Sequence, residues 1–230
     1  MTEPVSAILA AAMIAAGYIT IKCATPPNTS QNRHNTDRVS LIVTLLPSLL
    51  PLVSVGFIYH ALLTILPSYA PTHIPQLCPG YQTTNTALFT WNATTASSLA
   101  AIFVGGYIRL GAYSGLGRSF TFHLAAPDHL ITDGIYRWIQ HPSYVGLGLI
   151  VAGCEGLFLR WDATPACWLG EDVLARLDGW GVSVDVGALA LSIAICAARV
   201  KDEEDMLRGQ FGKEWEAWHR ETKRFIPGIF

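Results

Sequence analysis

Apolar residues along this chain fall into long uncharged runs separated by shorter polar segments. Five runs stand out, at 5–21, 41–66, 87–108, 144–159 and 181–198. A helix needs about 20 apolar residues to cross a bilayer, and a shorter run suffices when flanking side chains reach the interface. The runs are apolar on every face rather than amphipathic. We therefore expect an all-α polytopic membrane protein with about five transmembrane helices.

Composition agrees with lipid as the surrounding solvent. Of 230 residues, 51% are hydrophobic and only 14% are charged, and the mean hydropathy is +0.35. The net charge is -2, and like charges do not gather in long runs. This charge pattern argues against a nucleic-acid partner.

Two of the runs and one linking segment have features of their own. The run 5–21 could be a signal peptide, but it has no basic residue before it and no A-x-A-like cleavage site after it, which favours a membrane anchor. Pro47 and Pro51 predict a kink near the start of the run 41–66, with a re-entrant hairpin as the alternative. The uncharged segment 67–85, rich in Pro, Thr and Tyr, is predicted to be an exposed loop.

The number of lysines and arginines alternates between low and high from one polar segment to the next along the chain. The counts are none before the first run, three in 22–38, none in 67–85, three in 109–137, two in 160–180 and seven from 199 onward. The two in 160–180 are outnumbered by four acidic residues. Cytoplasmic segments carry the excess of basic residues in membrane proteins. The pattern predicts a lumenal N-terminus and a cytoplasmic C-terminus.

The five cysteines are Cys23, Cys78, Cys154, Cys167 and Cys196. Their number is odd, they are widely scattered, and no His lies near them at ligand spacing. We interpret them as small apolar residues and expect no metal site. Asp185, inside the last run but near its end, is interpreted as a solvated residue, with a functional role as the alternative.

A helix start at the membrane surface is the first candidate site. Pro142 favours the first helical position and His141 the cap before it, so the first N–H groups would face the cytoplasm and attract an anion such as a cofactor carboxylate. His141 could add a hydrogen bond, Tyr144 could pack against an adenine or ribose, and Gly146 would allow close approach. The alternative is a simple helix cap followed by an interfacial aromatic residue.

The segment from residue 199 onward is the second candidate. Arg199 and Glu203 are four residues apart and share one helical face, while Glu204 lies about 100° away. Such a pair could hold an anionic acceptor beside a cationic donor, although a solvated charged helix end would look similar. The segment 211–219 is amphipathic with aromatic residues on one side, and is predicted to lie on the membrane surface.

Together these pieces resemble the isoprenylcysteine carboxyl methyltransferase family. The family elements appear as His129 to Tyr136, His141 to Gly146, Arg199 with Glu203 and Glu204, Phe211-Gly212 with Trp215, and Ile226-Pro227. They come in the family's order and spacing over roughly the C-terminal half. Gln140 departs from the family, which usually has Arg before His-Pro, so a contact made by that Arg is in doubt; Trp215 stands where the family has Tyr.

The resemblance implies a membrane enzyme that uses S-adenosylmethionine to methylate the C-terminal carboxylate of a prenylated cysteine in proteins or peptides. It also implies a location in the endoplasmic reticulum. The chain is then divided into an N-terminal transmembrane region, 1–86, and a methyltransferase region, 87–230. The cofactor site would combine the loop before the fourth span with the C-terminal tail. Its implied cofactor-binding residues are Asp128, His129, Leu130, Ile131, Tyr136, His141, Pro142, Ser143, Tyr144 and Glu203.

The same resemblance assigns the catalytic roles. Arg199 would hold the acceptor carboxylate, Glu204 is carried over as its neighbour, and His123 is a weaker candidate. Rival interpretations are a methyltransferase acting on another lipid, such as a phospholipid amine, a membrane reductase, and a non-catalytic membrane scaffold. An amine acceptor would favour carboxylates over an arginine, and a nicotinamide reductase would favour more basic residues than 109–140 supplies.

Overall fold

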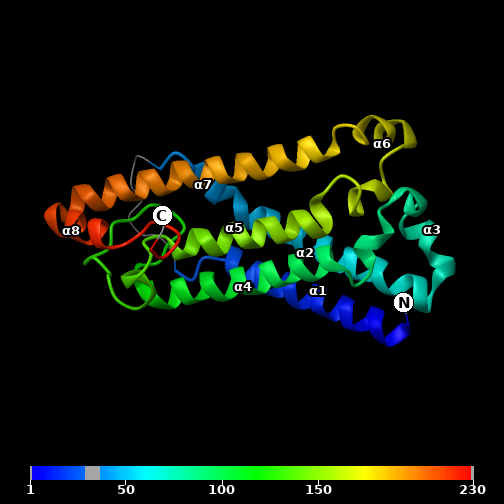
Figure 1. The fold of residues 1–230 in the computed structure, drawn as a ribbon, viewed down its shortest axis with the longest axis horizontal. Coiled ribbons are helices and arrows are strands. Elements are labelled where there is room, and N and C mark those ends of the chain that lie inside the picture. Colours follow the sequence, from blue (N-terminus) through cyan, green and yellow to red (C-terminus); the bar gives the residue numbers. More distant parts are fainter. Residues whose placement is uncertain (1, 29–36, 229–230) are drawn as a thin grey trace. The chain divides into compact units, whose positions relative to one another are not determined.

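The computed structural model describes residues 2–28 and 37–228, and their backbone is helical (Figure 1). The α-helices are α1 (Glu3–Ala24), α2 (Ser40–Tyr69), α3 (Ile74–Leu77), α4 (Ala93–Leu116), α5 (Pro142–Cys154), α6 (Glu171–Leu177), α7 (Gly181–Phe211) and α8 (Lys213–Glu221). Short 3₁₀ turns connect them, and a π-helical turn, Glu155–Leu159, extends α5. Within the described ranges, the β-structure is one isolated bridge between Ile139 and Lys223.

The expected all-α architecture is confirmed. Five helical segments, built on α1, α2, α4, α5 and α7, are long and apolar enough to cross a membrane. The helix α2 runs unbroken through both of its early prolines, so the re-entrant hairpin is wrong. Helix α7 continues without a break from the apolar run into the charged segment that follows it.

The third span begins later than its apolar run predicts, at Ala93 rather than residue 87. Asn92 and Thr95 form a reciprocal cap, in which each backbone N–H donates to the other's side-chain oxygen at 3.0 Å. Such a cap satisfies N–H groups that have no partner inside a helix and so fixes where the helix starts. Residues 86–89 form a separate 3₁₀ turn before it.

The chain divides into two compact units, each assembled from three stretches of sequence. Unit 1 comprises Met1–Lys22, Leu50–Phe103 and Leu149–Leu191, and unit 2 comprises Cys23–Leu49, Val104–Gly148 and Ser192–Phe230. Every boundary between them falls inside a long helix, so α1, α2, α4, α5 and α7 each contribute to both units.

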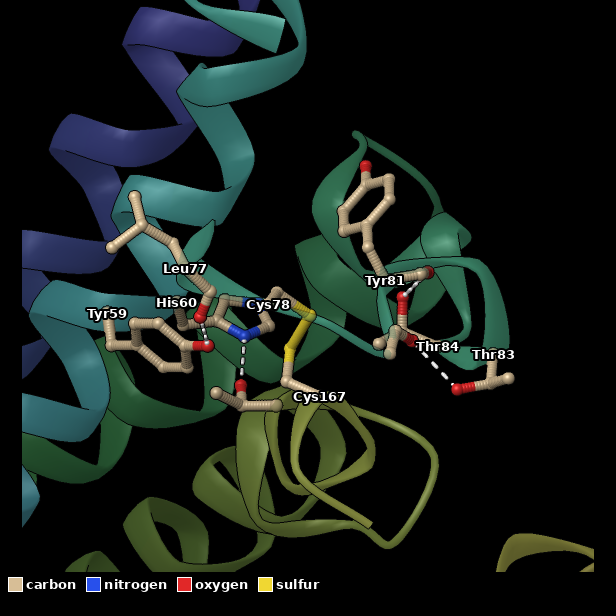
Figure 2. The surroundings of a disulfide bond; sticks show 10 residues. Tyr59, His60, Leu77, Cys78, Tyr81, Thr83, Thr84 and Cys167 are labelled. Carbon is tan, nitrogen blue, oxygen red and sulfur yellow. Dashed lines mark hydrogen bonds between the residues drawn. A yellow bond between two sulfur atoms is a disulfide. The ribbon is translucent and has the colours of Figure 1, made fainter. Parts of the chain in front are cut away.

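A disulfide is the main feature of unit 1. Cys78 and Cys167, 89 residues apart in sequence, are bonded, and both are almost completely buried (Figure 2). The bond lies in an apolar cluster with Leu63, Leu66 and Phe89. Our interpretation of all five cysteines as apolar fillers is therefore wrong for this pair, while Cys23, Cys154 and Cys196 are free thiols. Sequence spacing cannot reveal a pairing between residues that only the fold brings together.

The segment 67–85 forms short helical turns, and many of its residues are exposed, as the sequence predicts. Tyr59 donates to the carbonyl of Leu77 at 2.5 Å, and the N–H of Gly80 donates to the carbonyl of Cys167 at 3.1 Å. The N–H of Asn85 donates to the carbonyl of Asp162 at 2.8 Å. Two backbone N–H groups of the segment thus bond to the loop that contains Asp162 and Cys167, while polar side chains such as those of Thr72, Gln76 and Gln82 remain exposed.

Breaking the disulfide is expected to destabilise the protein. Replacing Cys78 and Cys167 together by Ala should lower the free energy of unfolding by about 2 to 4 kcal/mol, because the bond closes a long loop in the unfolded chain. Tryptophan fluorescence during heating, in detergent, would measure the effect. Dithiothreitol should lower the melting temperature of the parent and leave that of the double variant unchanged; a parent insensitive to reductant would rule the bond out.

Candidate functional site

Unit 2 contains a cavity of about 310 Å³. This volume is within the range of small-molecule sites, which is about 300 to 1,000 Å³. Its polar lining includes Arg109, Gln140, His141, Ser143, Tyr144, Arg199 and Glu203. The apolar lining includes Val39, Ile42, Val43, Leu46, Leu147 and Ile195.

The sequence-predicted cofactor residues are mostly brought together here. Leu130, Ile131, Tyr136, His141, Pro142, Ser143, Tyr144 and Glu203 all line the cavity, as does Arg199. Asp128 and His129 are exposed and are not among the lining residues. Glu204, which the resemblance assigned a catalytic role, is not among the lining residues either; it lies about 100° from Glu203 around α7.

The start of α5 forms one wall of the cavity. The helix begins at Pro142, and the carbonyl of His141 accepts the N–H of Tyr144 at 3.2 Å, as a capping position requires. The chain before it pairs with the C-terminal tail. The N–H groups of Gln140 and His141 donate to the carbonyls of Lys223 and Arg224 at 2.8 and 2.9 Å. Backbone hydrogen bonds therefore fix the His-Pro element.

The ring of His141 is held by one nitrogen and turned into the buried interior. Its Nε2 lies 3.2 Å from Oε1 of Glu204, and the residue is only 3% exposed. Among the described residues, Nδ1 is buried without a hydrogen-bond partner. A buried polar atom without a partner costs about 1 to 3 kcal/mol. His141 thus offers an unused polar atom at a cavity wall.

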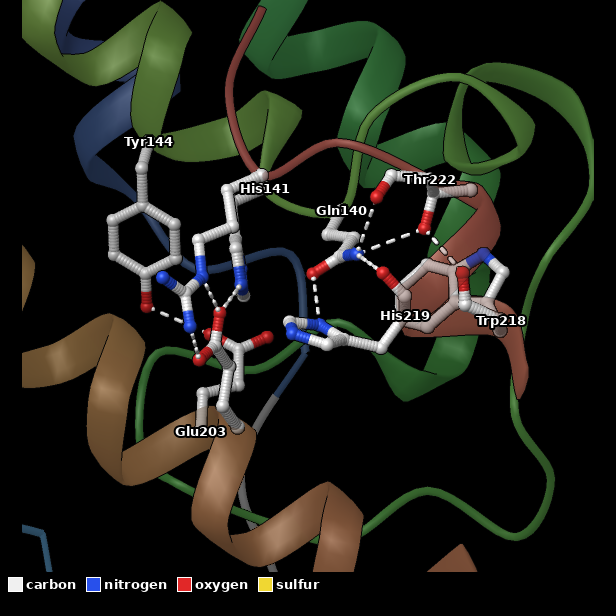
Figure 3. Close-up of polar contacts among 9 residues, drawn as sticks. Gln140, His141, Tyr144, Glu203, Trp218, His219 and Thr222 are labelled. Atoms are coloured by element: carbon white, nitrogen blue, oxygen red, sulfur yellow. Dashed lines mark hydrogen bonds and ion pairs between the residues drawn. The ribbon is translucent and has the colours of Figure 1, made fainter. Parts of the chain in front are cut away.

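Glu204 is fully occupied by neighbouring side chains. Besides His141, it accepts two hydrogen bonds from Arg224, at 2.7 and 2.8 Å, in the parallel geometry that suits a guanidinium and a carboxylate. Glu204 therefore joins α7, the start of α5 and the tail. Its neighbour Glu203 instead points toward Tyr144, whose hydroxyl donates to it at 2.9 Å (Figure 3).

Arg199 is nine-tenths buried and has partners on two sides. Its Nη2 donates to the carbonyl of Phe122 at 2.8 Å, and its Nη1 lies 2.7 Å from a carboxylate oxygen of Asp37. No sequence pattern indicated Asp37, which precedes α2 and lies far from α7 along the chain. The same carboxylate lies 4.0 Å from the ring of His123, another cavity-lining residue.

Gln140 is the central hydrogen-bonding residue of the tail. Its amide nitrogen donates to the hydroxyl and the carbonyl of Thr222 at 2.8 and 3.0 Å, and its oxygen lies 2.9 Å from Nδ1 of His219 (Figure 3). Burial lowers the pKa of His219, and the cationic neighbours oppose the effect of Glu204. The resemblance leads to an expectation of Arg at this position, whereas the neutral amide of Gln140 makes these contacts.

Helix α8 packs its aromatic side against protein. Trp215 is 6% exposed and clusters with Leu124, Met206 and Leu207, and Trp218 donates its indole N–H to the carbonyl of Tyr136 at 3.1 Å. The prediction that this side lies on the membrane surface is therefore wrong. The reversal of direction that allows this packing occurs at Gly212, whose φ of 53° favours glycine.

Sequence reasoning missed Arg109, which it treated only as the end of a span. Its Nε donates to the carbonyl of Cys23 at 2.9 Å, and its Nη1 donates to the hydroxyl and the carbonyl of Ser143 at 2.8 and 3.0 Å. Gly146 makes this contact possible, since a Cβ there would lie 2.5 Å from the carbonyl oxygen of Gly105 and 2.8 Å from Cβ of Arg109. Helix α4, which contains Gly105 and Arg109, therefore makes the close approach that was expected at Gly146.

The electrostatics of the cavity combine both signs of charge with neutral donors. Burial raises the pKa of Tyr136, and the negative charge of Glu203 raises it further, so the phenol stays neutral and donates to the carbonyl of Ala112 at 3.2 Å. Arg199 and Glu203 lie one helical turn apart on α7. A carboxylate and a guanidinium therefore share one partly apolar cavity.

Comparison with known proteins matches residues 98–175 to the isoprenylcysteine carboxyl methyltransferase (ICMT) family. Protein-S-isoprenylcysteine O-methyltransferase from Schizosaccharomyces pombe is 28% identical over 145 residues, which cover 61% of this chain and 52% of that protein. The Dictyostelium discoideum protein of the same name is 27% identical over 148 residues, covering 62% and 53%. Protein-S-isoprenylcysteine O-methyltransferase A from Arabidopsis thaliana is 29% identical over 139 residues, covering 57% and 58%.

The chain thus spans about half the length of the curated relatives that it matches. The family match covers α4 from Ser98 onward, the loop after it and α5, which include the cavity residues from Arg109 to Leu147. Over this part, the chain is similar to the isoprenylcysteine carboxyl methyltransferase family and to these relatives.

Proposed function

We propose that this protein transfers a methyl group from S-adenosylmethionine to the C-terminal carboxylate of a prenylated cysteine. The observation that carries the proposal is the cavity in which Arg199 and Glu203 lie on one helical face beside the start of α5. The match of residues 98–175 to the isoprenylcysteine carboxyl methyltransferase family and the names of the relatives support the same reaction. The acceptor would be a prenylated protein or peptide.

The lining residues fit the cofactor that the family implies. His141 has a buried Nδ1 without a partner among the described residues, and the first N–H groups of α5 favour a carboxylate. Glu203 would face the cationic part of the cofactor, and the ring of Tyr144 would pack against its flat groups. Leu130, Ile131, Pro142 and Ser143 would complete the surroundings, with Asp128 and His129 at the exposed margin. When bound, S-adenosylmethionine supplies a methyl group on a sulfonium.

Arg199 would orient the acceptor carboxylate. A C-terminal carboxyl has a pKa of about 3.5 and is ionised at neutral pH, so no residue has to remove a proton. A guanidinium carries five N–H donors, more than Asp37 and Phe122 occupy. The work left to the protein is alignment and exclusion of water, and alignment alone can supply about 7 to 11 kcal/mol.

The apolar part of the cavity would accept the prenyl chain. Apart from Val39, which directly precedes α2, the apolar side chains named above come from α2, α5 and α7, which belong to candidate membrane spans. A lipid acceptor in the bilayer could therefore reach the cavity without entering water. Glu204 would act as a positioning residue, since it holds His141 rather than lining the cavity.

We also propose that the protein resides in the endoplasmic reticulum with its N-terminus lumenal and its C-terminus cytoplasmic. The Lys and Arg counts favour this orientation. The disulfide supports it independently, because it joins the two segments, 67–85 and 160–180, that the counts assign to the lumen. Disulfides persist in the lumen of the endoplasmic reticulum, whereas the cytosol keeps thiols reduced.

Purified protein in detergent should convert labelled S-adenosylmethionine and N-acetyl-S-farnesylcysteine into a base-labile methyl ester. A Glu203→Ala variant should form the ester at least about a hundredfold more slowly. The change removes the carboxylate that would face the cationic part of the cofactor in a site from which water is excluded. Cofactor binding without ester formation would favour another lipid acceptor, such as a phospholipid amine. A parent that binds no cofactor would favour the non-catalytic scaffold.

Arg199→Lys should raise the KM for the farnesylcysteine about tenfold and leave cofactor affinity unchanged. Lysine keeps the positive charge but loses the planar fork that holds a carboxylate by two parallel bonds. Arg208→Lys is the matched control, since Arg208 lies on the same helix and its side chain is 64% exposed. Steady-state kinetics with varied acceptor give the answer, and parental kinetics in Arg199→Lys would remove Arg199 from the acceptor site.

Gln140→Ala should destabilise the tail. The change leaves the buried carbonyl of Thr222 and the ring of His219 without their partner, at a cost of about 1 to 3 kcal/mol. Thermal unfolding and cofactor titration should both show the loss, since the tail also pairs with the backbone of His141. Gln210→Ala, at an exposed position on α7, should match the parent; equal behaviour of the two variants would contradict this role.

A further inference from the structure

Two neighbouring residues before α2 make crossed ion pairs with α7. Asp37 contacts Arg199, with 2.7 Å between a carboxylate oxygen and Nη1. Arg38 contacts Asp202, with 3.3 Å between Nε and Oδ1, and its backbone N–H donates to Oδ2 of Asp202 at 3.1 Å. The adjacent residues Asp37 and Arg38 thus pair with Arg199 and Asp202, which are three residues apart on α7.

The two pairs differ in burial. The side chains of Asp37 and Asp202 are each 4% exposed, and that of Arg199 is 9% exposed, but that of Arg38 is 62% exposed. The contribution of an exposed partner is weakened by solvent. A buried carboxylate facing a buried guanidinium, by contrast, leaves an uncompensated charge when either is removed. The Asp37–Arg199 pair is therefore the tightly coupled one.

Asp37 is itself held in place on both of its oxygens. Oδ1 accepts the N–H of Val39 at 3.2 Å, and Oδ2 accepts the N–H of Leu124 at 3.2 Å. With both oxygens accepting, the carboxylate cannot rotate without losing a bond. It therefore presents a fixed surface to Nη1 of Arg199, while the carbonyl of Phe122 fixes Nη2 at 2.8 Å.

We propose that Asp37 is a positioning residue that fixes the plane of the Arg199 guanidinium for the acceptor carboxylate. This inference rests on the proposed function, because it assumes that Arg199 receives the acceptor. It extends the site to the segment before α2, which lies outside the residues that match the family. Methyl transfer requires the acceptor oxygen to be in line, and misplacement by about 1 Å can cost about a hundredfold in rate.

Removing the Asp37 charge has two opposing effects on binding of the acceptor. A misoriented guanidinium binds the acceptor less well, but loss of a nearby negative charge reduces repulsion of the acceptor carboxylate. These effects oppose each other in KM. Alignment alone governs kcat, so the loss should appear there.

Asp37→Asn is the test variant, because an amide must place its NH₂ group against either the N–H of Leu124 or Arg199, where both oxygens now accept. Asp202→Asn is the matched control: it breaks an equally buried carboxylate's contact with the same segment but leaves Asp37 and Arg199 paired. Both would be assayed with labelled S-adenosylmethionine and N-acetyl-S-farnesylcysteine, with rates normalised to the fraction of protein that binds cofactor.

The expected result is a kcat about ten- to a hundredfold lower in Asp37→Asn, a KM within about threefold of the parent, and a kcat within about twofold in Asp202→Asn. Parental kcat in Asp37→Asn would overturn the inference, as would equal losses in both variants. If Arg199→Lys itself is fully active, the acceptor assignment fails first, and that result separates failure of the proposed function from failure of this inference.

Discussion

The carboxylate of Glu204 holds together the parts on which the cavity depends. It joins α7 to the ring of His141 and to the guanidinium of Arg224. A carboxylate this buried must be paired, or its desolvation outweighs what it contributes. Because the backbone of Arg224 also accepts the N–H of His141, one charged group and one backbone bond fix the same corner. The start of α5 and the tail are thereby held in one arrangement.

That corner leaves adjacent residues of α7 facing different surroundings. Glu204 faces protein, whereas Glu203 faces the cavity and accepts the hydroxyl of Tyr144. Four residues earlier, Arg199 contributes the opposite charge. A helix places residues four apart on one face, so a rigid element sets the spacing between the two charges. Rigid placement suits a reaction whose main requirement is alignment.

The spans and the cavity face of α7 could be predicted because they follow from local rules. Apolar runs long enough for a bilayer predicted the five helices, and helical spacing placed Arg199 and Glu203 on one face. The start of α4 was misplaced because a cap of polar side chains, rather than hydropathy, determines it.

What the sequence could not give are contacts between distant segments. Asp37 and Arg199 are 162 residues apart in the sequence, and no residue near either one indicates that they pair. The same holds for Cys78 with Cys167 and for Gln140 with Thr222. Trp215 was misjudged for a related reason, since amphipathic spacing shows that a helix has an apolar side but does not show whether lipid or protein covers it.

The disulfide of unit 1 offers a chemical test of the proposed membrane orientation. In that orientation, with 67–85 and 160–180 in the lumen, the chain carries three thiols and one disulfide. A chain inserted the other way round would present 67–85 and 160–180 to the glutathione pool of the cytosol, and all five cysteines would remain thiols. The thiol content of a preparation therefore measures the fraction of molecules in each orientation without any added tag.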